Sequence, residues 1–287
     1  MKKIFRISLL IMFVVGLSGC LKKDELMNNS VYTTIYPIHY LTSYLYGEEK
    51  SVSSIYPNGA DVSKYELTTK QKETYSKGAL FVYNGLTEEK TLAKEFLNKN
   101  KNLLLIDVSY GLNYDNNIEE LWLSPNNYLM LAKNIKNNLL EYTTSKVVSD
   151  NITKKYQELE ETLSYMDALL RTIAKEAVMD GNPTLIVSSS KLKFLEKYGF
   201  QVIALDNESI NTATIKSNFK NNNYKDIYLC STDTKSDLIA ELETSYKANI
   251  IPVNMLYTLS DSNVSNNETY ETIMNDLIDN IRNTALN

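Results

Sequence analysis

The stretch DNITKKYQELEETLSYMDALLRTIAKEAV, residues 150–178, lies near the middle of the chain and carries one unbroken helical pattern. Its apolar residues follow each other at steps of three and four, which places them on one face of a helix. They are Ile152, Tyr156, Leu159, Leu163, Met166, Leu170 and Ile173. No Gly or Pro interrupts the pattern before Gly181, so we expect a helix roughly twice the mean length of ~11–12 residues.

Short apolar strands alternate with amphipathic helices on the N-terminal side of this stretch, which is typical of βα units around a parallel sheet. The expected strands are 31–37, 51–57, 79–85 and 102–109, and the expected helices are 38–47, 66–77 and 87–100. A further helix is expected at 125–141. It begins favourably, because Ser124 can cap free N–H groups and Pro125 fits a first turn.

The same alternation resumes after Gly181. The expected strands are 184–189, 200–206, 226–231 and 249–256, and the expected helices are 191–199, 211–222, 233–246 and 268–284. The sequence therefore predicts an α/β fold with two Rossmann-like βα lobes, residues 31–148 and 180–287, joined by one long backbone helix, residues 149–179. Because ligands of open parallel sheets bind beyond the carboxyl ends of the strands, we expect a ligand cleft between the lobes.

The first twenty residues have the pattern of a bacterial lipoprotein signal peptide. Basic residues open the chain, an apolar run follows at 7–15, and Leu17-Ser18-Gly19-Cys20 fits a lipobox. The run is shorter than the ~20 apolar residues that a spanning helix needs. We therefore expect cleavage before Cys20, lipid on its thiol, a tether at 21–30, and attachment to the outer face of the cell membrane. The alternatives are an ordinary signal peptide and an uncleaved anchor.

Composition excludes several classes of function. The net charge is −5 and no basic stripe is present, so we expect no binding to nucleic acid. With Cys20 lipidated, Cys230 is alone, which leaves no internal disulfide and no cysteine cluster for zinc. His39 is the one histidine, and no catalytic motif accompanies it, so we expect a protein that is not an enzyme. We expect a monomer.

Several segments together resemble the solute-binding lipoproteins of zinc and manganese ABC importers, the cluster A-I family. Residues 56–68, YPNGADVSKYELT, resemble the family loop P-x-G-x-D-P-H-x-Y-E-P-T. Residues 81–85 (FVYNG), 121–125 (LWLSP) and 194–200 (FLEKYGF) resemble family segments in the same order. The resemblance covers about residues 31–284. It implies a cleft that holds a divalent metal ion as transported ligand, and an ABC permease as partner.

The resemblance also assigns four metal-ligand positions, which in the family carry histidine and carboxylate. In this chain they fall on Ser63, Glu120 with Glu119 beside it, Ser189 with Ser188 or Ser190 as alternatives, and Asn254. No histidine remains, and serine is a poor zinc ligand because its hydroxyl stays protonated and uncharged near neutral pH. We therefore expect a weak or altered site for Zn²⁺ or Mn²⁺, with Glu120 as the candidate ligand and Asp61 or His39 as possible helpers.

Other interpretations stay open at this point. The chain could be a family member that no longer captures metal and acts as a surface adhesion, scaffold or regulatory lipoprotein, or that binds a non-metal solute. Glu120 could equally be a surface helix-cap carboxylate. Tyr65 and Trp122 fit packing roles, and Cys230 fits a buried small hydrophobic position.

Overall fold

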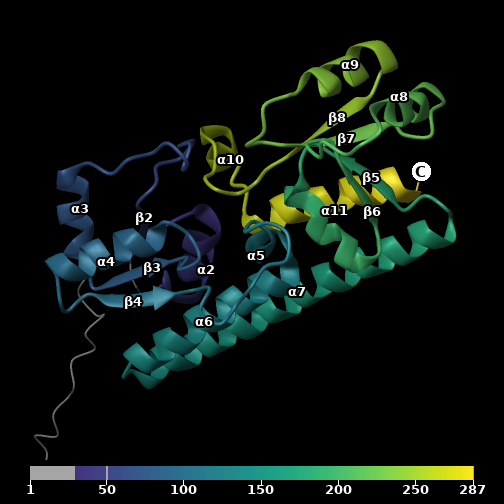
Figure 1. The fold of residues 1–287 in the computed structure, drawn as a ribbon. Coiled ribbons are helices and arrows are strands. Elements are labelled where there is room, and N and C mark those ends of the chain that lie inside the picture. Colours follow the sequence, from purple (N-terminus) through teal and green to yellow (C-terminus); the bar gives the residue numbers. More distant parts are fainter. Residues whose placement is uncertain (1–29, 50, 287) are drawn as a thin grey trace, which may run out of the picture.

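The computed structural model describes residues 30–49 and 51–286. The predicted signal peptide, Cys20 and residues 21–29 of the predicted tether lie outside these residues. The described chain forms two four-stranded parallel sheets with helices around them (Figure 1), so the predicted two-lobed α/β fold is confirmed. Within the described residues, no helix combines the length and the apolar character that crossing a bilayer requires.

The N-terminal sheet has the strand order β2-β1-β3-β4. Its strands are β1 (Val31–Thr33), β2 (Val52–Ser54), β3 (Leu80–Tyr83) and β4 (Leu104–Asp107). The helices of this lobe are α2 (Tyr36–Tyr46), α3 (Thr69–Ser76), α4 (Glu89–Lys99), α5 (Glu120–Leu123) and α6 (Pro125–Tyr142). Every residue of β3 is buried, as expected for a central strand covered on both faces.

The C-terminal sheet repeats this topology with the order β6-β5-β7-β8. Its strands are β5 (Thr184–Val187), β6 (Gln201–Ala204), β7 (Asp226–Cys230) and β8 (Asn249–Val253). Its helical segments are η1 (Ser190–Tyr198), α8 (Thr212–Lys220), α9 (Asp237–Tyr246), α10 (Asp261–Ser265) and α11 (Tyr270–Leu286). Residues that follow strands of both sheets, such as Tyr56 after β2 and Asn254 after β8, line one common cavity.

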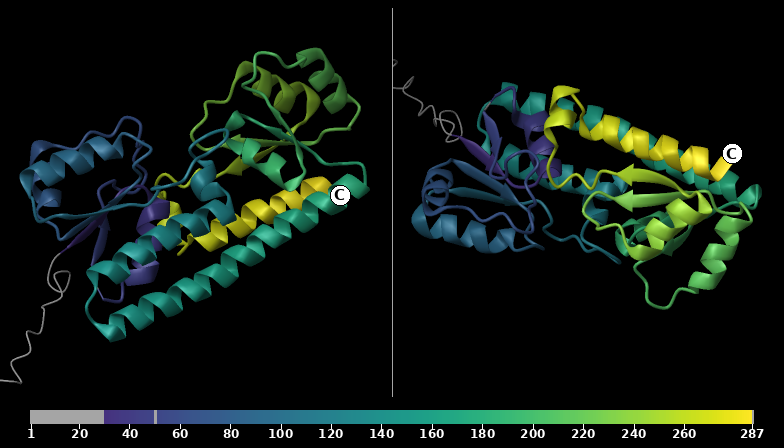
Figure 2. Two further views of the ribbon diagram at one scale, coloured as in Figure 1. Left: turned by 60° about the horizontal axis from the view of Figure 1, so that its bottom comes forward. Right: turned by 90° about the horizontal axis from the view of Figure 1, so that it is seen from above.

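Helix α7 (Lys146–Met179) joins the two lobes. Its 34 residues span about 51 Å at ~1.5 Å per residue. All seven residues of the predicted apolar face are buried, so this helix prediction is confirmed. Helices α6 and α11 both pack against α7, and α11 lies alongside its C-terminal half (Figures 1 and 2). The domain boundaries at 148 and 180 stay predictions.

Some local predictions were wrong in detail. The first strand ends at Thr33 rather than at residue 37, because Pro37 lies in the first turn of α2, where its missing N–H costs no hydrogen bond. The helix expected at 191–199 is a 3₁₀ helix, η1, that ends at Gly199 with a φ of 112°. The short helices α5 and α10 were not predicted.

Candidate functional site

A cavity of about 1390 Å³ lies between the lobes. The N-terminal lobe contributes the loop 59–65 after β2, together with Glu119 and Trp122 near α5. The C-terminal lobe contributes Lys191 at the start of η1 and Asn254 directly after β8. These parts of the wall follow strands, as ligand sites of parallel sheets do, and residues of α3, α4 and α11 complete it.

Ser63, the first predicted ligand position, lies in the wall of this cavity but is engaged within its own loop. Its hydroxyl donates a hydrogen bond to Oδ1 of Asp61 at 2.6 Å, and Lys64 Nζ lies 2.7 Å from Oδ2 of the same carboxylate. The hydrogen bonds from Lys64 and Ser63 lower the pKa of Asp61. Asp61 therefore stays ionised and acts as the centre of a local turn.

Glu120, the second predicted position, is 1% exposed and lies outside the cavity wall. Its Oε1 accepts hydrogen bonds from the backbone N–H of Asp115 at 2.8 Å and from Lys197 Nζ at 3.1 Å. The neighbouring Glu119 faces the cavity instead, is 4% exposed, and accepts a hydrogen bond from the Tyr257 hydroxyl at 2.9 Å. The adjacent carboxylates thus have different surroundings, and only that of Glu119 is directed at the space between the lobes.

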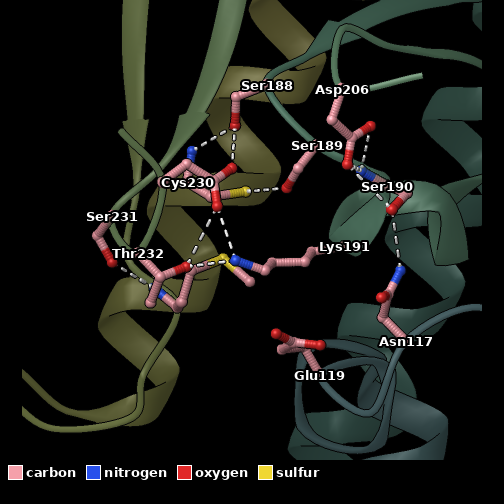
Figure 3. A network of polar contacts seen from close by, with 12 residues as sticks. Asn117, Glu119, Ser188, Ser189, Ser190, Lys191, Asp206, Cys230, Ser231 and Thr232 are labelled. Atoms are coloured by element: carbon pink, nitrogen blue, oxygen red, sulfur yellow. Dashed lines mark hydrogen bonds and ion pairs between the residues drawn. The ribbon is translucent and has the colours of Figure 1, made fainter. Parts of the chain in front are cut away.

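The three serines after β5 each have a separate partner. Ser188 donates to Oδ2 of Asp233 at 2.6 Å, and Ser189, which is buried, donates to Sγ of Cys230 at 3.8 Å. Ser190 donates to Asp206 at 3.2 Å and accepts from Asn117 of the N-terminal lobe at 3.4 Å. Figure 3 shows the serines in a row from Cys230 on one side to Asp206 and Asn117 on the other. The three hydroxyl groups thus connect the end of β5 to neighbouring segments of the chain.

Asn254, the fourth predicted position, lines the cavity at the end of β8. Its Oδ1 accepts a hydrogen bond from the backbone N–H of Leu256 at 2.8 Å. Leu256 has a φ of 63°, an uncommon conformation for a residue with a branched side chain, and the Asn254 bond stabilises this turn. Of the four predicted positions, Ser63 and Asn254 therefore line the cavity, whereas Glu120 and Ser189 do not.

His39 and Cys230 take no part in the cavity wall. The Nδ1 of His39 lies 3.2 Å from the Thr33 hydroxyl, and burial lowers the pKa of the imidazole. Cys230 is buried at the end of β7, where burial raises the pKa of its thiol to about 11. The thiol is therefore protonated at neutral pH, consistent with a packing role.

A lysine with two partners in the C-terminal lobe was not among the sequence-based candidates. Lys191 Nζ lies 2.7 Å from Oδ1 of Asp233 and donates to Oγ1 of Thr232 at 2.8 Å. Figure 3 shows Lys191 extended toward Thr232, with the carboxylate of Glu119 below the Lys191 side chain in this view. Burial disfavours the charged form of Lys191, but the Asp233 hydrogen bond and the charges of Asp233 and Glu119 outweigh it, so its pKa is raised.

The cavity wall, as far as the structure describes it, contains no imidazole or thiolate donor. Within the described residues, no group of three or more His, Cys, Asp or Glu side chains is placed to hold a metal ion. Zinc prefers imidazole and thiolate ligands, and the side chains at this end of the cavity offer carboxylate, hydroxyl and amide oxygens. The charged side chains of the wall are net acidic, and the ammonium of Lys191 lies among them.

Sequence comparison identifies the family of the chain. A family model described as zinc-uptake complex component A, periplasmic (ZnuA), matches residues 31–284. A protein of Thermotoga maritima, provisionally named as metal-binding, is 26% identical over 220 residues, covering 75% of this chain and 76% of its own.

Solved structures share the fold. The metal-dependent lipoprotein YcdH from Bacillus subtilis has a TM-score of 0.73 at 22% identity, over 91% of this chain and 100% of its own. The Zn(II)-bound ZnuA-like domain of Streptococcus pneumoniae AdcA has 0.73 at 19%, over 90% and 98%. The zinc-binding protein TroA from Treponema pallidum has 0.67 at 18%, over 90% and 99%. The family model covers nearly all of the described residues, and the chain therefore belongs to the ZnuA family of periplasmic solute-binding proteins.

Proposed function

We propose that the chain is the extracytoplasmic solute-binding subunit of an ABC importer of the zinc and manganese type. One observation carries this proposal: both sheets direct the carboxyl ends of their strands at one shared cavity, and α7 connects the lobes behind it. Family membership supports it, because members of the family serve ABC permeases as periplasmic binding proteins. The lipobox at Cys20 supports attachment to the outer face of the membrane.

The cargo site is altered relative to the family pattern. None of the four assigned positions carries histidine, and the Glu120 carboxylate already accepts hydrogen bonds from Lys197 Nζ and the backbone N–H of Asp115. The names of the pneumococcal and treponemal neighbours refer to zinc, which makes zinc the reference cargo for this chain. We expect divalent ions to bind weakly, because the oxygen donors lining the cavity supply no imidazole.

Cross-linking in intact cells of the source bacterium tests the importer assignment. The lipoprotein is cross-linked in place, purified under denaturing conditions, and its partners are identified by mass spectrometry. The expected partner is the membrane-spanning permease of an ABC importer. Recovery of other surface proteins with no ABC permease would contradict the assignment and would favour an adhesion, scaffold or regulatory role.

A further inference from the structure

Lys191 is placed where the two lobes meet. It is the second residue of η1 and directly follows the three serines that come after β5, and its side chain is 25% exposed in the cavity wall. The ammonium contacts Asp233 at 2.7 Å and Thr232 at 2.8 Å, both after β7. A lysine side chain is charged at neutral pH. The cavity therefore contains a fixed positive charge that belongs to the chain.

Asp233, the carboxylate that pairs with Lys191, is held in place by further hydrogen bonds. Asp233 is 14% exposed, and its second oxygen accepts a hydrogen bond from Ser188 at 2.6 Å. Ser188 in turn accepts the backbone N–H of Cys230 at 3.0 Å, and the Asp233 backbone N–H donates to the Cys230 carbonyl at 2.9 Å. The Asp233 carboxylate is thus held in place beside the ammonium of Lys191, and Lys191 itself lines the cavity.

A second carboxylate comes from the other lobe. Glu119 is 4% exposed, lines the same cavity, and is fixed by the Tyr257 hydroxyl. Within the described residues it forms no direct ion pair, and its negative charge acts on Lys191. Carboxylates contributed by both lobes and a hydroxyl from Thr232 are the kind of oxygen donors that a hard divalent cation prefers.

From this arrangement we infer that Lys191 is the specificity-determining residue of the cavity: its ammonium takes the place of a metal ion between Asp233 and Glu119 and keeps divalent cations out. A second cation next to Lys191 would be repelled by it and would have to compete for the same Asp233 oxygen. Removing the ammonium takes the charged partner from Oδ1 of Asp233 and from the Thr232 hydroxyl, and it leaves the negative charges of Asp233 and Glu119 without this lysine. An oxygen-preferring ion such as Mn²⁺ is then the expected ligand.

Lys191 would set the cargo of the importer proposed above, and its biological meaning rests on that function. Metal binding, however, is measured on the purified protein alone. A failure of the Lys191 assignment is therefore distinguishable from a failure to capture a permease.

A calorimetric titration of the full-length protein in detergent with Mn²⁺ tests whether Lys191 excludes divalent cations. Lys191→Ala is expected to bind one Mn²⁺ at least about tenfold more tightly than the wild type, because it removes a like charge from the site. Lys191→Met keeps most of the apolar stem, loses the charge, and is expected to behave in the same way. Should one of the two variants fail to fold, the other decides.

Lys216→Ala is the matched control. Lys216 is 31% exposed and pairs with Glu241 at 2.8 Å between α8 and α9, outside the cavity wall. It should bind Mn²⁺ as the wild type does, and so should Lys191→Arg, which retains the charge. The double variant Lys191→Ala with Asp233→Asn should lose the gained affinity. Binding by Lys191→Ala and Lys191→Met that is no tighter than that of Lys216→Ala would overturn the assignment, as would tight stoichiometric Mn²⁺ binding by the wild type.

Discussion

Lys197 Nζ of the C-terminal lobe lies 3.1 Å from Oε1 of Glu120 in the N-terminal lobe, a carboxylate that is 1% exposed. Lys197 also lies 3.0 Å from Oδ2 of Asp115. The backbone N–H of Asp115 donates to the same Glu120 oxygen. The position that the family resemblance assigns to a metal ligand is therefore occupied by an ion pair that connects the lobes.

Lys197→Ala is expected to lower the free energy of unfolding by about 1–3 kcal/mol, because a buried carboxylate loses its charged partner and keeps only backbone donors. Urea denaturation followed by circular dichroism measures this. Lys235→Ala is the control, since Lys235 pairs with Glu243 in a more exposed setting, and exposed pairs contribute about 0–1 kcal/mol. Equal effects of the two substitutions would contradict a structural role for the Glu120 pair.

Stability should depend on pH through Glu89, which burial gives a pKa of about 7. The folded-state pKa lies above the ordinary glutamate value of 4.5, so the folded state binds more protons than the unfolded state between these two pH values. The contribution of Glu89 to the free energy of unfolding is therefore complete below the pKa of the unfolded state. It is lost as the pH rises through the pKa of the folded state. Glu89→Gln should remove that loss, with a gain at pH 8 over pH 5 of up to about 3 kcal/mol.

Urea titrations at about pH 5, 6, 7 and 8, which bracket the Glu89 pKa of about 7, measure the difference in free energy of unfolding between Glu89→Gln and the wild type. Glu88→Gln is the control, because Glu88 is the exposed neighbour in sequence. Parallel pH profiles for the wild type and Glu89→Gln would show that Glu89 does not titrate in this range.

Cys230 should be inert in the folded protein. It is buried, and its thiol has a raised pKa of about 11, so little thiolate is present at neutral pH. In a Cys20→Ser form, an aromatic disulfide reagent should react with Cys230 only after urea is added. Fast labelling of the native protein, with a rate equal to that of the unfolded chain, is the result that would argue against this packing.

The proposed anchor depends on Cys20. Cys20→Ser should abolish lipid attachment, and the protein should then leave the membrane fraction of cells grown with labelled palmitate. Cys230→Ser is the control and should stay membrane-bound and labelled. A Cys20→Ser protein that sediments with membranes as before would favour an uncleaved signal anchor.

The fold is largely readable from the apolar periodicity of the chain. The seven residues that predict α7 are all buried, and the eight strands lie within the expected ranges. The short elements α5 and α10 contain 4 and 5 residues, too few to display a helical period. Pro37 was taken as the end of a strand because proline fits either a strand end or a first helical turn.

The site was less predictable, because neighbouring residues on a helix point in directions about 100° apart. Glu119 and Glu120 are adjacent in sequence, and tertiary packing alone decides which of them faces the cavity. Lys191 escaped prediction because lysine is not a usual metal ligand. The available signal was its position directly after the three serines, together with an Asp shortly after the end of β7.

The metal content and metal affinity of the wild-type protein test most directly whether Lys191 keeps divalent cations out of the cavity. The untagged full-length chain is purified in detergent, analysed for bound elements, and titrated with Zn²⁺ and Mn²⁺ by calorimetry. We expect no stoichiometric metal after purification and no saturable binding at micromolar concentrations, because Lys191 supplies the cation. One tightly held ion per chain would contradict it, and would show that side chains outside the assigned positions rebuild the family site.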